Sequence, residues 1–133
     1  MKTLLDEQLD RRLKENLPDL EVFVLNDFGW LGLRNGQIRE KLNEHQFQFL
    51  ITADKNMPFQ QHLGKMNFTL ILLDTPSLLW PIQELFVPKL KILLNHPPVP
   101  LPKIISLGIP GFSMGKKKLA LLNLAGKENI LFL

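Results

Sequence analysis

Residues 49–58 read FLITADKNMP, and this stretch decides the fold that we predict. Its apolar and β-branched beginning is typical of a buried β-strand, which we place at residues 47–51. The strand stops abruptly at Asp54-Lys55-Asn56, a turn that carries a carboxylate, an ammonium and an amide. Asn56 and Pro58 then suit the start of a short helix, as N-cap and first-turn residue. The stretch therefore predicts a strand, a polar turn and a helix in direct succession.

Two earlier apolar runs end in the same way. Leu4-Leu5 leads directly into Asp6-Glu7, and residues 22–25 stop at Asn26-Asp27. Because the carboxyl ends of parallel strands lie at one edge of a sheet, acids that follow three such strands would gather in one pocket. The sequence therefore predicts an acidic pocket, and the function that we expect depends on it.

The rest of the chain alternates strands with helices. We expect strands at residues 2–5, 21–25, 47–51, 68–73 and 103–107, and helices at residues 8–16, 37–45, 56–63 and 78–95, the last interrupted by Pro81 and Pro88. This alternation predicts an α/β fold, a three-layer α/β/α sandwich with a central parallel sheet of four to five strands. A strand order of 2-1-3-4-5 would bring Asp6 and Asp54 together. Residues 1–107 form the expected domain, and residues 108–133 form a C-terminal extension of unknown role.

The composition is that of an ordinary globular protein. The 133 residues are 45% hydrophobic and 22% charged, which disfavours disorder, and the lack of cysteine excludes disulfides, thiolate catalysis and cysteine-bound zinc. Charged residues from Asp6 onward argue against a signal peptide, and the apolar run at residues 68–73 is far shorter than the roughly 20 residues that span a bilayer. We therefore expect a cytoplasmic protein without a membrane partner. The net charge of +3 and the basic clusters at residues 11–14 and 116–118 fit solvated faces better than a nucleic-acid interface.

Carboxylates gathered at one site are suited to hard divalent cations. Mg²⁺ and Mn²⁺ prefer oxygen ligands, and such an ion polarises a phosphoryl oxygen and activates water for phosphodiester hydrolysis. Asp6 and Asp54 are the expected metal ligands, and Glu7 and Asp27 are candidates for an outer position or a second metal. Lys55 is a candidate contact to phosphate. The structural alternative is that each acid only caps a helix or turn.

Three segments resemble a compact family of bacterial PIN-like domains. They are LLDE at residues 4–7, GWLGLRNG at residues 29–36 and LITADKN at residues 50–56. The similarity continues through QQHL at residues 60–63 and covers roughly residues 1–107. It implies a metal-dependent ribonuclease that uses Mg²⁺ or Mn²⁺ on an RNA substrate. PIN domains are often toxins of toxin–antitoxin pairs, so the resemblance also implies an antitoxin protein and a homodimer as candidate partners.

The resemblance assigns roles residue by residue. Asp6 matches the acid that follows the first strand of these domains, and Asp54 matches the acid of their Thr-Ala-Asp turn. Relatives often carry glutamate after the Asn-Gly pair at residues 35–36, where this chain has Gln37. Glu40, one helical turn later, is the expected catalytic substitute, and Glu44 is a weaker one.

The substrate contacts follow from the same comparison. Asn56 is one candidate substrate-binding residue, and it stands where many of these domains have a further aspartate. Lys55 and Arg34 are the other candidate substrate-binding residues.

Two other interpretations remain open. In a phosphoacceptor receiver domain, Asp6-Glu7 would be the acidic pair and residues 54–58 the phosphorylation turn. Such a domain needs a lysine at the carboxyl end of strand five, where this chain has Ser106-Leu107-Gly108, and it has no counterpart of the loop around Trp30. The second interpretation is a PIN-like module that binds RNA or a partner without cutting, because glutamine at position 37 and asparagine at position 56 remove negative charge.

Overall fold

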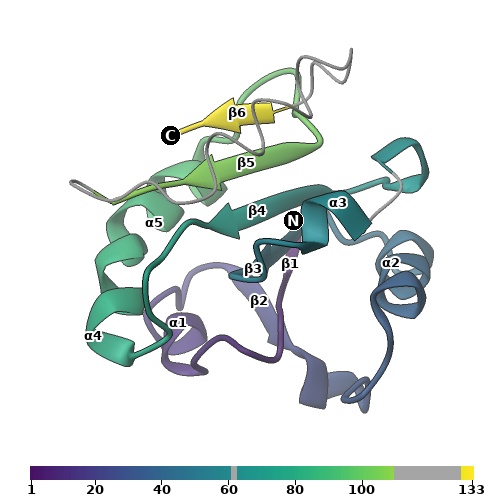
Figure 1. Ribbon diagram of the computed structural model, residues 1–133, viewed down its shortest axis with the longest axis horizontal. Helices are drawn as coiled ribbons and strands as arrows, with labels where there is room; N and C mark the ends of the chain where they lie inside the picture. The colour runs from purple at the N-terminus through teal and green to yellow at the C-terminus, as the bar shows by residue number, and fades with distance from the viewer. Residues whose placement is uncertain (61–62, 110–129) are drawn as a thin grey trace.

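The computed structural model describes residues 1–60, 63–109 and 130–133. Six parallel strands form a single sheet in the order β2-β1-β3-β4-β5-β6 (Figure 1). They are β1 (Lys2–Leu5), β2 (Glu21–Val24), β3 (Phe49–Thr52), β4 (Thr69–Leu73), β5 (Ile104–Leu107) and β6 (Ile130–Phe132). The α/β class and the 2-1-3-4-5 order of the first five strands are therefore confirmed. The basic residues 116–118 lie outside the described residues.

The number of strands is larger than predicted. The sequence pattern gave four to five, whereas β6 pairs with β5, with Ile105 opposite Leu131. The last apolar residues of the expected C-terminal extension therefore belong to the same sheet, since they supply a row of backbone partners for the otherwise open edge of β5.

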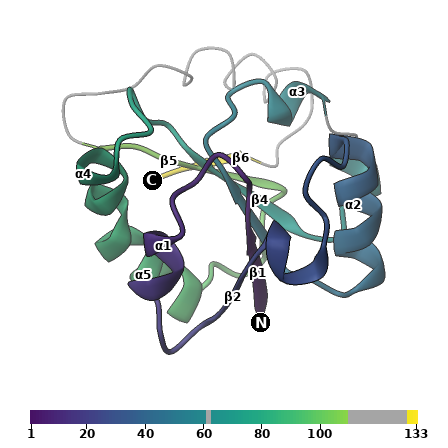
Figure 2. The same ribbon diagram turned by 90° about the horizontal axis from the view of Figure 1, so that it is seen from below.

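Both faces of the sheet are covered. Every residue of β3, β4 and β5 is buried, as expected for parallel strands with helices on each side. Successive side chains of β3 point to opposite faces, so Phe49 and Ile51 join one apolar cluster and Leu50 joins the other. In Figure 2, α1, α4 and α5 lie on one side of the strands, and α2 and α3 lie on the other.

The helices and helical turns connect these strands. They are α1 (Arg12–Glu15), η1 (Leu25–Phe28), α2 (Asn35–Glu44), α3 (Met57–Gln60), η2 (Leu63–Lys65), α4 (Trp80–Gln83), η3 (Glu84–Phe86) and α5 (Val87–Asn95). The interruption predicted within residues 78–95 is confirmed, because Pro81 and Pro88 each stand in the first turn of a new helix.

Two of the predicted boundaries that differ from the structure lie at local turns of the chain. The helix expected at residues 8–16 begins only at Arg12, and in the turn that precedes it the Asp10 carboxylate accepts the Arg12 backbone N–H at 2.9 Å. The strand expected from Phe47 begins at Phe49, because Gln46 has a left-handed φ of 58° and the Phe47 N–H still bonds to the Leu42 carbonyl at the end of α2.

None of the helices in the described residues is long and apolar enough to cross a membrane.

Candidate active site at the carboxyl edge of the sheet

The candidate site lies where β1 and β3 end side by side. Leu5 is opposite Ile51, and the Asp6 N–H donates to the Ile51 carbonyl at 2.9 Å, one residue beyond β1. In the sheet, β1 lies between β2 and β3. The chain passes from β1 to β2 on one side of β1 and then crosses to β3 on the other side. In open parallel sheets, ligands bind outside the carboxyl ends of the strands at such a change of direction. Asp6 therefore occupies the position where this class of fold places ligands.

The buried Asp6 carboxylate accepts two hydrogen bonds. The residue is 7% exposed, and its Oδ1 accepts the Glu7 N–H at 2.9 Å while its Oδ2 accepts the Thr52 hydroxyl at 2.7 Å. Burial raises the pKa of Asp6, and the negative charges of Glu7 and Asp54 raise it further against the opposing effect of the two hydrogen bonds. A cation bound beside Asp6 would relieve this unfavourable environment of the ionised form.

Thr52 connects Asp6 to the turn that carries Asp54. The same hydroxyl that donates to Asp6 accepts the Asp54 N–H at 3.0 Å. Asp54 is half-buried, and its Oδ1 accepts the Asn56 N–H at 3.0 Å, which closes a turn immediately before α3. Thr52 therefore links the Asp6 carboxylate to the backbone of the Asp54 turn, and the Asp54 carboxylate itself caps that turn.

A cavity of about 330 Å³ opens beside Asp54, and Asp6 is not among the residues that line it. Its walls come from the segments after β1, β3 and β4, namely Gln8, Ala53, Asp54, Lys55, Thr75, Pro76, Ser77 and Leu78. The predicted phosphate contact Lys55 thus lies in the same cavity as Asp54. Asn56 is exposed on the adjoining turn, and Glu7 is exposed next to Asp6.

Asp74 is an acid of this edge that the sequence analysis missed. It follows β4, its side chain is 3% exposed, and its Oδ1 lies 3.7 Å from Lys55 Nζ. Its backbone N–H donates to the Leu107 carbonyl at 2.8 Å, which extends the pairing of β4 with β5. A signal was present, because Leu72-Leu73-Asp74 repeats the pattern Leu4-Leu5-Asp6.

Asp27 is engaged elsewhere. Its Oδ2 accepts the Val24 N–H at 2.9 Å and lies 3.0 Å from Lys14 Nζ, so it caps η1 and forms an ion pair with α1. The hydrogen bond from Val24 and the ammonium of Lys14 lower the pKa of Asp27. The charges that raise the pKa of Asp6 belong to Glu7 and Asp54. For Asp27, the alternative stated above, in which the acid only caps a helix or turn, therefore holds.

The predicted residues of α2 stand apart from the acidic pair. Arg34 precedes the helix and Glu40 lies within it, and both are exposed. Among the residues that the structure describes, no hydrogen bond or ion pair joins either side chain to Asp6 or Asp54. Gln37 accepts the Arg34 N–H through its Oε1 at 3.0 Å, so it caps the first turn of α2.

The carboxylates at this edge are too few to enclose a metal ion on their own. In residues 1–60, 63–109 and 130–133, no group of three or more His, Cys, Asp or Glu side chains could enclose a metal ion. Mg²⁺, however, usually takes one or two carboxylates and completes its shell with water and substrate phosphates. Asp6 and Asp54 are the two carboxylates of this edge that the sequence analysis names as ligands, and the Gln8 amide oxygen lies 3.4 Å from the Thr52 hydroxyl.

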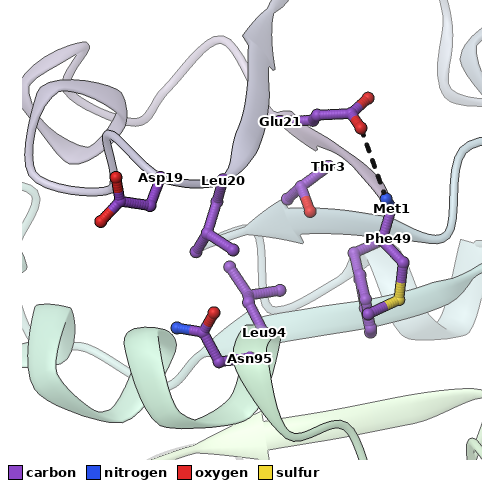
Figure 3. Close-up of a pocket in the computed structure, with 8 residues that line it drawn as sticks. All are labelled: Met1, Thr3, Asp19, Leu20, Glu21, Phe49, Leu94 and Asn95. Atoms are coloured by element: carbon purple, nitrogen blue, oxygen red, sulfur yellow. Dashed lines mark ion pairs between the residues drawn. The ribbon is translucent and has the colours of Figure 1, made fainter.

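A second cavity lies at the opposite, amino end of the sheet. It measures about 220 Å³ and is lined by Met1, Thr3, Asp19, Leu20, Glu21, Phe49, Leu94 and Asn95. Figure 3 shows Asp19 and Glu21 on opposite sides of it, and the Glu21 carboxylate lies 3.6 Å from the Met1 amine. This cavity therefore lacks the adjacent carboxylates that distinguish the carboxyl edge.

No family model, curated protein or solved structure matches this chain.

Proposed function

We propose that this protein is a PIN-like, metal-dependent ribonuclease whose active site lies at the carboxyl edge of the sheet. The observation that carries the proposal is the buried Asp6 carboxylate, whose pKa is raised by burial and by the neighbouring charge of Asp54. Buried carboxylates with a raised pKa are frequent at catalytic and ion-binding sites, and the Asp54 turn, which Thr52 links to Asp6, lines the adjoining cavity. The resemblance of residues 4–7, 29–36 and 50–56 to PIN-like domains supports RNA as the substrate and an antitoxin protein as a partner.

Each residue of this edge has its own role in the proposed reaction. Asp6 and Asp54 would hold Mg²⁺ or Mn²⁺, and the bound ion would polarise a phosphoryl oxygen and supply an activated water. The Thr52 hydroxyl keeps the Asp6 carboxylate in place through its 2.7 Å hydrogen bond. Lys55, in the adjoining cavity, would contact the substrate phosphate as a point charge.

Calorimetric titration of Mn²⁺ tests the metal site without a choice of substrate. We expect wild-type protein to bind Mn²⁺ and the Asp6→Asn/Asp54→Asn variant to lose that binding, because the carboxylates are the ligands. The matched control is Asp10→Asn/Asp19→Asn, which removes two acids outside the site and should bind like wild type. Equal binding by wild type and the Asp6/Asp54 variant would contradict the proposal.

Cleavage of single-stranded RNA then tests the reaction. Hydrolysis should require Mg²⁺ or Mn²⁺, stop with a chelator, and fall by at least about a hundredfold in Asp54→Asn, as expected when a ligand of a catalytic ion is lost. RNA binding without cleavage by the metal-loaded protein would favour the non-catalytic module.

A phosphoacceptor receiver is the second candidate, favoured by one observation. The strand order 2-1-3-4-5 is that of the flavodoxin-like folds, which include receivers, and Asp54 follows β3. Gly108 and Ile109, the described residues after β5, supply no lysine. Incubation with acetyl phosphate and Mg²⁺, followed by mass spectrometry, separates the candidates, since only a receiver gains a phosphoryl group at Asp54.

A further inference from the structure

We propose that Gln83 is a positioning residue, which sets the distance between two loops that line the cavity beside Asp54. This inference rests on the proposed function, in which the substrate phosphate enters that cavity, and it assigns the shape of the cavity to a residue that does not line it. The observation is a pair of hydrogen bonds made by one side-chain amide. Gln83 Oε1 accepts the Asp10 N–H at 2.9 Å, and Gln83 Nε2 donates to the Leu78 carbonyl at 2.6 Å.

The two partners belong to loops that the sheet does not join. Asp10 lies in the loop after β1, and Leu78 lies in the loop after β4. Because β3 stands between these strands, strand pairing does not fix how far apart their loops lie. Both loops line the cavity, the first through Gln8 and the second through Leu78, and Asp54 comes from the turn after β3. The Gln83 bridge therefore connects the two outer segments of a cavity whose middle segment carries Asp54.

Both loops are also hydrogen-bonded internally. In the first, the Leu9 N–H donates to the Asp6 carbonyl at 3.1 Å. In the second, the Thr75 hydroxyl donates to the Ser77 carbonyl at 2.8 Å, and the Ser77 hydroxyl accepts the Leu79 N–H at 3.1 Å. A bond that holds one backbone group of such a loop also limits the positions of its neighbours, so the bridge acts on the cavity-lining residues of both loops.

The amide that makes the bridge has little freedom to move. Gln83 is the last residue of α4 and is 1% exposed, and close packing restricts the rotamers of a side chain that is so deeply buried. With this amide removed, the Asp10 N–H and the Leu78 carbonyl would each lose a partner, and the loops would become free to separate. The substrate would then have to order them again, which weakens binding.

Steady-state cleavage of single-stranded oligouridylate by the Mn²⁺-loaded protein tests this role. Gln83→Met keeps an unbranched side chain of similar volume at the buried position but makes neither hydrogen bond. Its KM should rise by at least about tenfold, because the substrate must order the loops. Its kcat should stay within about threefold of wild type, since Asp6 keeps its hydrogen bonds with Ile51 and Thr52.

Asn43→Leu is the matched control. Asn43 also bridges two backbone groups, since its Nδ2 donates to the Lys65 carbonyl at 2.7 Å and its Oδ1 accepts the Asn67 N–H at 2.9 Å. These partners precede β4, at the amino edge of the sheet and away from the cavity. The control should therefore lose stability, as Gln83→Met should, but leave KM within about twofold of wild type.

Hydrogen exchange tests the bridge in the wild-type protein without any substitution. The Asp10 amide should exchange at least about a hundredfold more slowly than in an unfolded peptide, because Gln83 Oε1 accepts its proton in the folded state. Exchange of Asp10 at the rate of an unfolded peptide overturns the inference. Should Gln83→Met fail to fold, Gln83→Asn takes its place in the cleavage assay, because an amide that is one methylene shorter reaches at most one of the two partners.

The outcomes of the cleavage assay separate this inference from the proposed function. An unchanged KM in the Gln83 variant, measured beside an active wild type, overturns the positioning role alone. Equal increases of KM in Gln83→Met and Asn43→Leu also overturn it, because a general loss of stability would then explain both. Wild-type protein that binds Mn²⁺ but cleaves no RNA overturns the proposed function and, with it, this inference.

Discussion

At the scale of single residues, the buried Asp6 carboxylate at the end of β1 destabilises the folded protein when it is ionised. Its position one residue beyond β1 buries the carboxylate, and only two hydrogen bonds compensate the ionised form. Acids in such surroundings favour the protonated form, so the folded state binds a proton more tightly than the unfolded chain. Proteins commonly carry this kind of local instability at functional sites.

The pH dependence of stability tests this description of Asp6. Because its folded pKa is raised above the ordinary 3.8, its stabilising contribution is complete below that value and is lost as the pH rises through the folded pKa. Asp6→Asn, measured by urea unfolding with a chelator present, should therefore be more stable than wild type at neutral pH, by on the order of 1 kcal/mol. At about pH 3 the difference should vanish.

Asp10 supplies a control of opposite sign. Its hydrogen bonds with Arg12 lower the pKa of Asp10, so its contribution is present above the ordinary pKa and is lost as the pH falls through the folded value. Asp10→Asn should accordingly lose stability at neutral pH. A destabilised Asp6→Asn at neutral pH would show that its hydrogen bonds outweigh burial.

At the scale of elements, Gln37 caps the beginning of α2. Its amide oxygen accepts the Arg34 N–H at 3.0 Å, at a position where the PIN-like domains that the sequence resembles often carry glutamate. Either glutamine or glutamate can make this contact at the third position of a helix. Position 37 can therefore serve the helix whichever of the two residues it carries.

Unfolding of two variants at position 37 tests the capping role. Gln37→Ala should lower the free energy of unfolding by about 0.5–1 kcal/mol, because the Arg34 N–H loses its partner. Gln37→Glu should equal or slightly exceed wild type, since a carboxylate also interacts favourably with the helix N-terminus. Exposed Glu40→Ala, in the same helix, is the control and should change stability by less than about 0.5 kcal/mol. An unchanged Gln37→Ala would show that the cap contributes nothing.

At the scale of the whole molecule, stability comes from two apolar clusters separated by the sheet. One cluster joins α1 and α5 to the sheet, and the other joins α2 and α3 to it. The acidic edge projects from strands that are buried on both faces, so the Asp6 and Asp54 turns stand on a rigid base.

A substitution in the central strand β4 tests how much this buried core contributes to the free energy of unfolding. Ile71 lies in β4 and is 0% exposed, so Ile71→Ala should lower the free energy of unfolding by about 2–5 kcal/mol through lost burial and a new cavity. Ile92 is 66% exposed on α5, and Ile92→Ala should change stability by less than about 0.5 kcal/mol. Comparable losses in both variants, measured by urea unfolding, would mean that Ile92 is covered in solution.

The sequence by itself determined the α/β class and the approximate places of the first five strands, and it suggested their order. Apolar runs specify strands through neighbours in the chain, and parallel connectivity then brings the strand ends to one edge. Leu72-Leu73-Asp74 also repeats the pattern Leu4-Leu5-Asp6 in the sequence. The partner of Asp74, however, comes from another strand end and cannot be read from that pattern.

Only the tertiary structure decided which acid meets which partner. Asp27 turns to Lys14, thirteen residues earlier, and Asp74 turns to Lys55 on the adjacent strand end. It also decided that residues 130–132 complete the sheet beside β5. The physical reason is that charges and unpaired strand edges act through space between segments far apart in the chain, and local patterns of hydrophobicity carry no record of those distances.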